Sequence, residues 1–178
     1  MNHIILMKYG YHASEEVDSI IKRKLLEIEE KGFCFWGYGG TLLHPLNQVQ
    51  PFCEKEKVYL LLSFTNSKYF GDSMRANYYS SDKINYQKIP KEINVYGSKK
   101  ALVFNNLKKV DFDINLYDYE VEIGNSKGKS LADYFKLRVD KVCAVYKETS
   151  KIKKMVHIDY IAELVYPYSV FIKEELWK

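Results

Sequence analysis

Apolar residues recur at every third or fourth position between residues 15 and 31, and this spacing predicts an amphipathic helix. Ser14 is a good N-cap, acidic residues fill the first turn, and Gly32 supplies the expected C-terminal stop. We expect one face of this helix to join the core, and its members are Val17, Ile20, Ile21, Leu25 and Ile28. The charged side chains on the other side should face solvent, and these are Lys22, Arg23, Glu27 and Glu30.

Most other apolar segments are short or alternate with polar residues, which predicts strands. The cleanest alternation runs from Val110 to Leu116. Further strands are predicted at residues 3–9, 33–36, 59–65, 101–104, 119–123, 137–146 and 156–160. One long helix among many strands favours an α+β fold. We therefore expect a single domain over residues 1–178, with the N-terminal helix packed on a twisted, mainly antiparallel sheet or partial barrel.

Length and cysteine content place the chain in a broad class. Its 178 residues suit one domain with a self-sufficient core, and the 47% hydrophobic and 28% charged fractions are ordinary for a globular protein. An odd count of three cysteines, without a Cys-x-x-Cys pair, favours a reducing compartment. The sequence contains neither a signal-peptide pattern nor an apolar run of about 20 residues. We expect a cytoplasmic protein with no membrane partner.

Basic residues concentrate between positions 99 and 154, which hold 13 Lys or Arg against 8 Asp or Glu. The densest group consists of Lys151, Lys153 and Lys154. Such an excess can meet phosphate or an acidic protein surface, and it can equally be a solvated lysine surface. Arginine, which nucleic-acid recognition favours, occurs only three times in the chain. A nucleotide or nucleic-acid partner therefore ranks below a protein partner.

The most unusual segment combines glycines with aromatic residues and continues through His44 to a proline-containing stretch. Its core is the run Trp36, Gly37, Tyr38, Gly39 and Gly40. Glycines allow close backbone approach and positive φ, while the aromatic rings offer stacking faces for a base, a nucleotide or another side chain. The alternative is a bulged hairpin whose aromatic rings fill the core. Strand alternation predicts a partly buried Trp36 supporting an exposed contact residue, Tyr38.

His12 lies between a predicted strand and the start of the predicted helix, where free backbone N–H groups attract anions. The order of strand, Tyr11-His12-Ala13-Ser14 and helix resembles the first motif of ADP-ribosyltransferases, in which Tyr-His-Gly-Thr holds a nicotinamide dinucleotide. The resemblance covers about 20 residues and lacks the glycine after His12. It implies a small nucleotide-binding enzyme with His12 in the ligand site.

Metal ligation and a complete catalytic set are not indicated. The four histidines and three cysteines do not follow the short spacings of zinc sites, so we expect no metal and no cofactor. The favoured hypothesis is a small non-enzymatic binding protein, because 16 tyrosines suit an interface. Its lysine-, isoleucine-, asparagine- and tyrosine-rich composition would fit a phage or mobile element, with inhibition of a bacterial defence nuclease (anti-CRISPR-like) as one role. The nucleotide-binding enzyme is the alternative.

Overall fold

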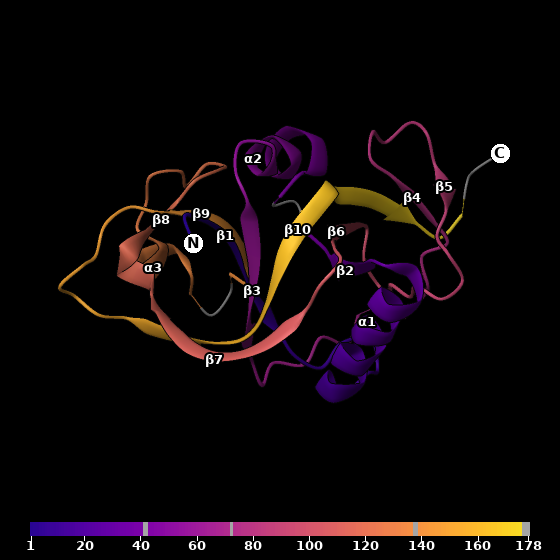
Figure 1. The fold of residues 1–178 in the computed structure, drawn as a ribbon, viewed down its shortest axis with the longest axis horizontal. Helices are drawn as coiled ribbons and strands as arrows, with labels where there is room; N and C mark the ends of the chain where they lie inside the picture. The colour runs from indigo at the N-terminus through magenta and orange to yellow at the C-terminus, as the bar shows by residue number, and fades with distance from the viewer. Residues whose placement is uncertain (41–42, 72, 137–138, 176–178) are drawn as a thin grey trace.

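The computed structural model describes residues 1–40, 43–71, 73–136 and 139–175, and Figure 1 shows an α+β arrangement. Within these residues, ten strands form one sheet. The strands are β1 (His3–Tyr9), β2 (Cys34–Tyr38), β3 (Val58–Phe64), β4 (Tyr78–Ser80), β5 (Gln87–Lys88), β6 (Lys100–Phe104), β7 (Lys108–Asn115), β8 (Tyr119–Val121), β9 (Lys141–Tyr146) and β10 (Met155–Lys173). The helices are α1 (Val17–Lys31), α2 (Gln50–Cys53) and α3 (Leu131–Tyr134), with a π-helical turn at Pro45–Val49 and a 3-10 turn at Leu116–Asp118.

The strand order is β2-β6-β10-β3-β1-β9-β8, with β4 and β7 paired to β10 outside this path and β5 paired to β4. β1 and β3 pair in parallel, and the other described pairs are antiparallel. The sheet is therefore mixed, with a parallel pair near its centre. Parallel neighbours need a long crossover, and the segment between β1 and β3 contains α1, β2 and α2. A partial barrel stays a prediction.

β10 is much longer than the sequence pattern suggested, because it continues past Pro167 to Lys173. Its register against β6 shifts between Leu164 and Ser169, and Pro167 lies inside this irregular interval. Proline has no N–H to donate to a ladder, so a register irregularity is where a strand accommodates it. The first part of β10 pairs with β7 and β3, and the last part pairs with β6 and β4. One strand thus links both halves of the sheet (Figure 1).

Several element boundaries differ from the sequence-based expectation. β2 continues two residues beyond position 36, where the predicted strand ends, and so includes Gly37 and Tyr38. Residues 66–92, for which no strand was predicted, contain β4 and β5. β9 begins at Lys141, and positions 137 and 138, where this strand was expected to begin, lie outside the described residues. These differences arise where long-range pairing, rather than local alternation, defines the strand.

α1 begins at Val17, two residues later than predicted. The preceding residues form a separate turn, in which the backbones of His12 and Glu15 exchange two hydrogen bonds of 3.1 and 2.8 Å. Ser14 takes a φ of +68° in this turn, and Glu16 occupies the N-cap position instead. The helix ends at Gly32, whose φ of +80° is the left-handed conformation that glycine adopts without steric cost.

The buried face of α1 contains most of the predicted apolar stripe, because Ile20 and Ile21 join the core and Val17 and Ile28 pack against it. Ile20 and Ile21 are buried, but so are Lys24 and Glu27, whereas Leu25 is 45% exposed. The expectation that Leu25 belongs to the core and Glu27 faces solvent is therefore wrong. The buried face extends to Lys24 and Glu27 because these charged side chains find partners in the protein.

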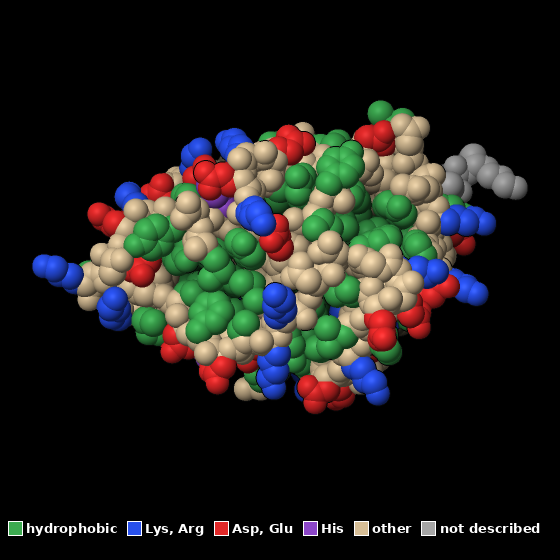
Figure 2. Space-filling model, in the orientation of Figure 1, with side chains coloured by type: hydrophobic (Ala, Val, Ile, Leu, Met, Phe, Trp, Pro, Cys, Tyr) green, Lys and Arg blue, Asp and Glu red, His purple; other side chains and the backbone are tan. Residues whose placement is uncertain are grey.

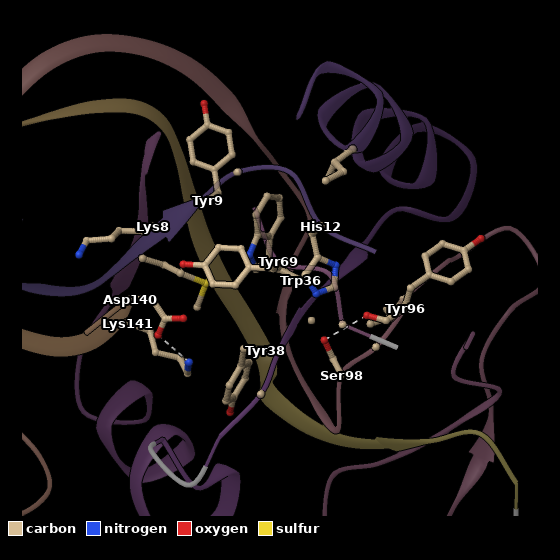
Figure 3. Close-up of a pocket in the computed structure, with 18 of the residues that line it drawn as sticks. Lys8, Tyr9, His12, Trp36, Tyr38, Tyr69, Tyr96, Ser98, Asp140 and Lys141 are labelled. Atoms are coloured by element: carbon tan, nitrogen blue, oxygen red, sulfur yellow. Dashed lines mark hydrogen bonds and ion pairs between the residues drawn. The ribbon is translucent and has the colours of Figure 1, made fainter. Parts of the chain in front are cut away.

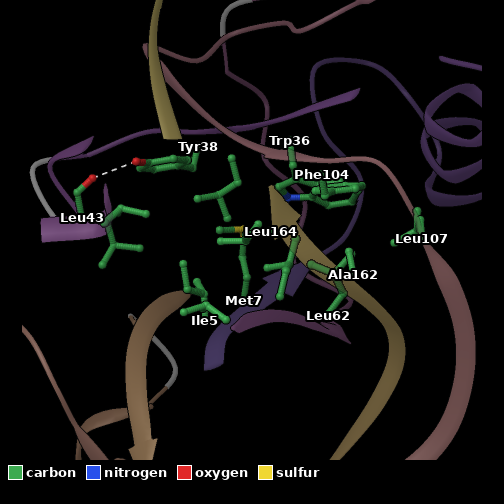
Figure 4. Packing of buried hydrophobic residues seen from close by; sticks show 14 of the residues in the cluster. Ile5, Met7, Trp36, Tyr38, Leu43, Leu62, Phe104, Leu107, Ala162 and Leu164 are labelled. Atoms are coloured by element: carbon green, nitrogen blue, oxygen red, sulfur yellow. Dashed lines mark hydrogen bonds between the residues drawn. The ribbon is translucent and has the colours of Figure 1, made fainter. Parts of the chain in front are cut away.

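Buried apolar residues of the sheet pack on both of its faces. Leu62 joins a cluster with Trp36 and Phe104 on the side of α1 (Figure 4), and Leu61 joins a cluster with Leu131 on the side of α3. Successive side chains of a strand point to opposite faces, so β3 contributes to both clusters. No helix in the described part of the chain is long and apolar enough to cross a membrane.

Candidate functional site

A cavity of about 640 Å³ opens beside the end of β1. Its walls come from α1, from the end of β2 with the following glycines, and from the segments 68–71 and 94–98. Asp140 and Lys141, at the start of β9, complete the lining (Figure 3). Small-molecule sites typically measure about 300–1,000 Å³, so the cavity has the size of a ligand site.

The sequence-predicted residues His12, Trp36, Tyr38, Gly39 and Gly40 all line this cavity. They come from two segments separated by the whole of α1. The parallel pairing of β1 and β3 and the attachment of β2 through β6 and β10 bring these segments together. The fold therefore joins the two sequence features that were considered separately, the histidine at the strand–helix junction and the glycine–aromatic segment.

Aromatic rings dominate the lining. Trp36 packs edge-on against Tyr9, with ring centroids 6.3 Å apart, and lies 6.5 Å from the ring of Phe104. Tyr69 contributes a further ring, whereas the ring of Tyr96 points away from these residues in Figure 3 and has Arg23 Cζ over it, 5.3 Å from its centroid. Such an array offers flat faces to a planar ligand. In the sequence, only the excess of tyrosines pointed to an aromatic site. It did not indicate which tyrosines would come together in the cavity.

Tyr38 is not the exposed contact residue that strand alternation predicted. Only 4% of the residue is accessible, and its hydroxyl donates a 2.8 Å hydrogen bond to the carbonyl oxygen of Leu43. The same hydroxyl lies 2.7 Å from Ser169 Oγ (Figure 4 shows the bond to Leu43). Burial raises the pKa of this phenol. Tyr38 therefore fastens β2 to the chain that follows it and to β10.

The glycines of the segment serve two different purposes. A Cβ at Gly37 would lie 2.6 Å from Ser98 Oγ and 2.7 Å from Val95 Cγ1, so only glycine allows segment 94–98 to approach β2 this closely. Gly40 has a φ of +78°, a conformation that favours glycine. The close approach at Gly37 sets the width of the cavity on this side.

His12 is half-buried on the cavity wall. Burial lowers the pKa of its imidazole, and Arg23 lowers it further, while Glu15 opposes the shift. Because the unperturbed pKa is about 6.5, His12 is largely neutral at pH 7 and has one ring nitrogen that accepts a proton. A neutral imidazole can accept a hydrogen bond from a ligand or act as a base.

A charged network on α1 forms another wall and was not predicted from the sequence. Glu27 accepts hydrogen bonds from Lys24 Nζ at 2.9 Å and from Arg23 Nη1 at 3.0 Å. Both cations also donate to the carbonyl oxygen of Asn94, and the backbone N–H of Asn94 donates to Glu27. This network fixes segment 94–98 against α1. Burial lowers the pKa of Lys24, and Glu27 partly offsets that effect.

Cationic side chains outnumber anionic ones in the lining. Asp140 is the carboxylate among the described lining residues, and it pairs with Lys141 at 2.8 Å. Lys68 lies over the ring of Tyr11 at 5.3 Å, close to the exposed Phe70. Arg23 is bound to Glu15 and Glu27, so its charge is largely balanced. The remaining positive charge favours an anionic ligand.

Four predicted site residues lie outside the lining. His44 Nδ1 accepts a 3.3 Å hydrogen bond from Asn47 N and caps the π-helical turn, while its ring packs against Phe171. Lys154 donates to the carbonyl oxygen of Ala132 in α3. Lys151 and Lys153 are exposed in the loop before β10. The structure therefore does not bring the lysine group into the cavity.

The three cysteines are free and buried. Burial raises the pKa of the Cys34 thiol to about 12, so it is protonated at neutral pH and packs as a small hydrophobe. Within the described ranges, no three His, Cys, Asp or Glu side chains lie in an arrangement that could hold a metal ion.

Comparison with known proteins does not assign a family. No protein-family model, curated protein or solved structure matches the chain. The likeness of residues 11–14 to an ADP-ribosyltransferase motif therefore remains a local one. The cavity is therefore the feature of the protein that indicates a function.

Proposed function

We propose that the protein binds a nucleotide in the cavity between β1, β2 and α1. The observation that supports this proposal is the convergence of aromatic rings, a neutral histidine and surplus lysine charge in one cavity of about 640 Å³. A nucleotide combines a planar base with an anionic phosphate. The first part suits the rings of Trp36 and Tyr69. The second suits Lys68 and Lys141, which pairs with Asp140.

Ligand binding to the folded state raises thermal stability, which provides a direct test. A nucleotide at a hundredfold excess over its dissociation constant adds about 2.7 kcal/mol. For a protein of this size we expect the melting temperature to rise by about 5–11 °C. The panel contains AMP, GMP, ATP, cyclic AMP and nicotinamide adenine dinucleotide, and each is compared with its parent nucleoside. Absence of any shift across the panel would refute the proposal.

Two variants localise the binding. Lys141→Gln removes a cation, so the affinity for the phosphorylated ligand should fall about 10–100-fold while the weaker nucleoside binding stays unchanged. Tyr69→Leu removes a stacking face and should weaken nucleotide and nucleoside alike. Lys153→Gln removes an exposed lysine outside the cavity and serves as the matched control. Equal losses in Lys141→Gln and Lys153→Gln would indicate non-specific charge attraction instead.

A second candidate function is catalysis on a nucleotide, as the ADP-ribosyltransferase resemblance implies. One observation favours it, namely that the half-buried, neutral imidazole of His12 faces the cavity. Release of nicotinamide from the dinucleotide by the wild-type protein, and its loss in His12→Ala, would show that the protein is an enzyme. Binding of the dinucleotide without turnover would show that the protein only binds it. Inhibition of a defence nuclease stays a prediction from composition, and the cavity favours a small ligand over a protein partner.

A further inference from the structure

The outward face of α1 carries apolar residues that the protein leaves uncovered. Leu25 is 45% exposed and Leu26 is 46% exposed. With Ile21 and Tyr160 they form the floor of a shallow groove of about 270 Å³. This face lies away from Arg23 and Lys24, which line the nucleotide cavity. Adjacent exposed leucines on a helix are typical of an interaction surface.

Two of the three charged residues of this groove, Lys22 and Glu29, stand symmetrically about the two leucines, and the third, Asp18, lies one turn before Lys22. Lys22, Leu25, Leu26 and Glu29 stand at positions i, i+3, i+4 and i+7, so they share one side of the helix. The midpoint of Lys22 and Glu29 coincides with the midpoint of Leu25 and Leu26. A basic residue thus flanks the two leucines on one side, and an acidic residue flanks them on the other, with Asp18 beyond Lys22. Figure 2 shows side chains of both signs along the lower edge of the molecule, where Figure 1 places α1.

We propose that this face binds a second copy of the chain, with the two α1 helices antiparallel about a two-fold axis. In that arrangement Leu25 packs against Leu26 of the second copy, and Lys22 meets Glu29 of the second copy, twice by symmetry. Each charged pair lies about 5 Å along the helix from the crossing point, within reach of the long side chains. A parallel two-fold pair would instead place Lys22 against Lys22 and Glu29 against Glu29. The charge arrangement therefore selects the antiparallel orientation.

The surface available for such a dimer extends beyond α1 but remains modest. Tyr160 borders the groove, and its ring packs edge-on against Tyr9, which in turn contacts the 48% exposed Phe64. A contact centred on one 15-residue helix falls below the about 1,200–2,000 Å² of a standard stable interface. We therefore expect a weak dimer, in equilibrium with monomer between about 10 and 500 μM.

Sedimentation equilibrium over this concentration range tests the role of the leucines. The wild-type protein should show a reversible monomer–dimer equilibrium. Leu25→Gln/Leu26→Gln should remain monomeric at 500 μM with an unchanged melting temperature, because both side chains are already half in solvent. The matched control is Ile84→Gln/Ile152→Gln, which changes two residues that are 80% and 64% exposed elsewhere. It should dimerise like the wild type.

Charge reversal tests the antiparallel geometry. Lys22→Glu places two acidic residues opposite each other in both pairs, and Glu29→Lys places two basic ones there. At low salt, each single variant should dissociate about tenfold more readily than the wild type. The double variant Lys22→Glu/Glu29→Lys should recover wild-type affinity. Mixing the two single variants should give a heterodimer tighter than either homodimer, because both of its pairs then join opposite charges.

Three results would overturn the proposal. They are a wild-type monomer at 500 μM, a dimer that Leu25→Gln/Leu26→Gln leaves intact, and single charge variants that the double variant fails to rescue. Thermal melting of each variant identifies any that do not fold. The experiment contains no nucleotide, so its outcome is independent of the function proposed for the cavity.

Discussion

At the scale of single residues, Tyr38 shows how a side chain at a cavity can be structural. Its ring lines the cavity, while its hydroxyl links the carbonyl oxygen of Leu43 to Ser169 on β10. Lys100 Nζ lies 5.4 Å from the ring centroid and donates to the carbonyl oxygen of Gly40. Tyr38 therefore holds the glycine turn in place. Replacing Tyr38 should lower the stability of the protein rather than its affinity for a ligand.

We expect Tyr38→Phe to lower the free energy of unfolding by about 1–3 kcal/mol, because two buried oxygen atoms lose a hydrogen-bond partner. Tyr38→Ala should lower it by about 3–5 kcal/mol, the usual result of deleting a buried aromatic ring. Phe70→Ala, at a residue that is 78% exposed, is the control and should change stability by less than about 0.5 kcal/mol. Urea denaturation measures all three. A stable Tyr38→Ala protein would show that the hydroxyl contacts carry little energy.

At the scale of elements, α1 has one face that packs on the protein and one that is exposed to solvent. One face inserts Lys24 and Glu27 beside Asn94 and so positions the cavity wall. The other presents Leu25 and Leu26 to solvent. Buried charges require partners, because an unpaired ion in the protein interior costs several kcal/mol. Pairing with Asn94 and with each other is what allows these charges to face inward.

Removing one partner of this buried network should therefore be costly. We expect Glu27→Gln to lower the free energy of unfolding by about 3–5 kcal/mol, since the buried Lys24 then lacks its counter-charge, whereas Arg23 keeps its pair with Glu15. The double variant Lys24→Met/Glu27→Gln should lose less than Glu27→Gln alone, because it no longer buries an unpaired ammonium. Glu30→Gln, an exposed position on the same helix, is the control. Equal effects of Glu27→Gln and Glu30→Gln in chemical denaturation would contradict the network.

At the scale of the whole molecule, β10 couples the two halves of the sheet. Ile158 packs in the cluster beneath α3, and Ile172 packs in a separate cluster with Phe35 at the other end of the strand. Between them, β10 pairs with β3 and β6. β10 belongs to both halves of the sheet. If it loses its pairing in one half, strand edges become exposed in the other half as well.

The chain should therefore unfold as one cooperative unit. Ile158→Ala and Ile172→Ala each delete a comparable buried volume, and we expect each to lower stability by about 2–5 kcal/mol. Both should shift the same single transition, seen by calorimetry and by hydrogen exchange in β7 and β6 alike. Two separable transitions, each sensitive to only one of the variants, would show that the halves fold independently.

Some features of this molecule follow from sequence alone, because neighbouring residues decide them. The alternation of Val110, Phe112 and Ile114 indicates the strand β7, and apolar periodicity followed by Gly32 indicates a helix over most of α1. Both the strand pattern and the helix pattern depend on residues that lie within a few positions of each other in the sequence. The glycine–aromatic segment and His12 could likewise be recognised as unusual, and both line the cavity.

Only the tertiary structure decided that Lys24 and Glu27 are buried and Leu25 exposed on α1, how Tyr38 is placed and what completes the cavity. Lys24 is buried because it bonds to the carbonyl oxygen of Asn94, a residue 70 positions later, and Tyr38 because Ser169 lies 131 positions away. Asp140 and Lys141 enter the wall because β9 pairs with β1. Hydrophobic periodicity assumes that charged side chains face water, and it fails where distant chain segments provide the counter-charge and the hydrogen bonds that burial requires.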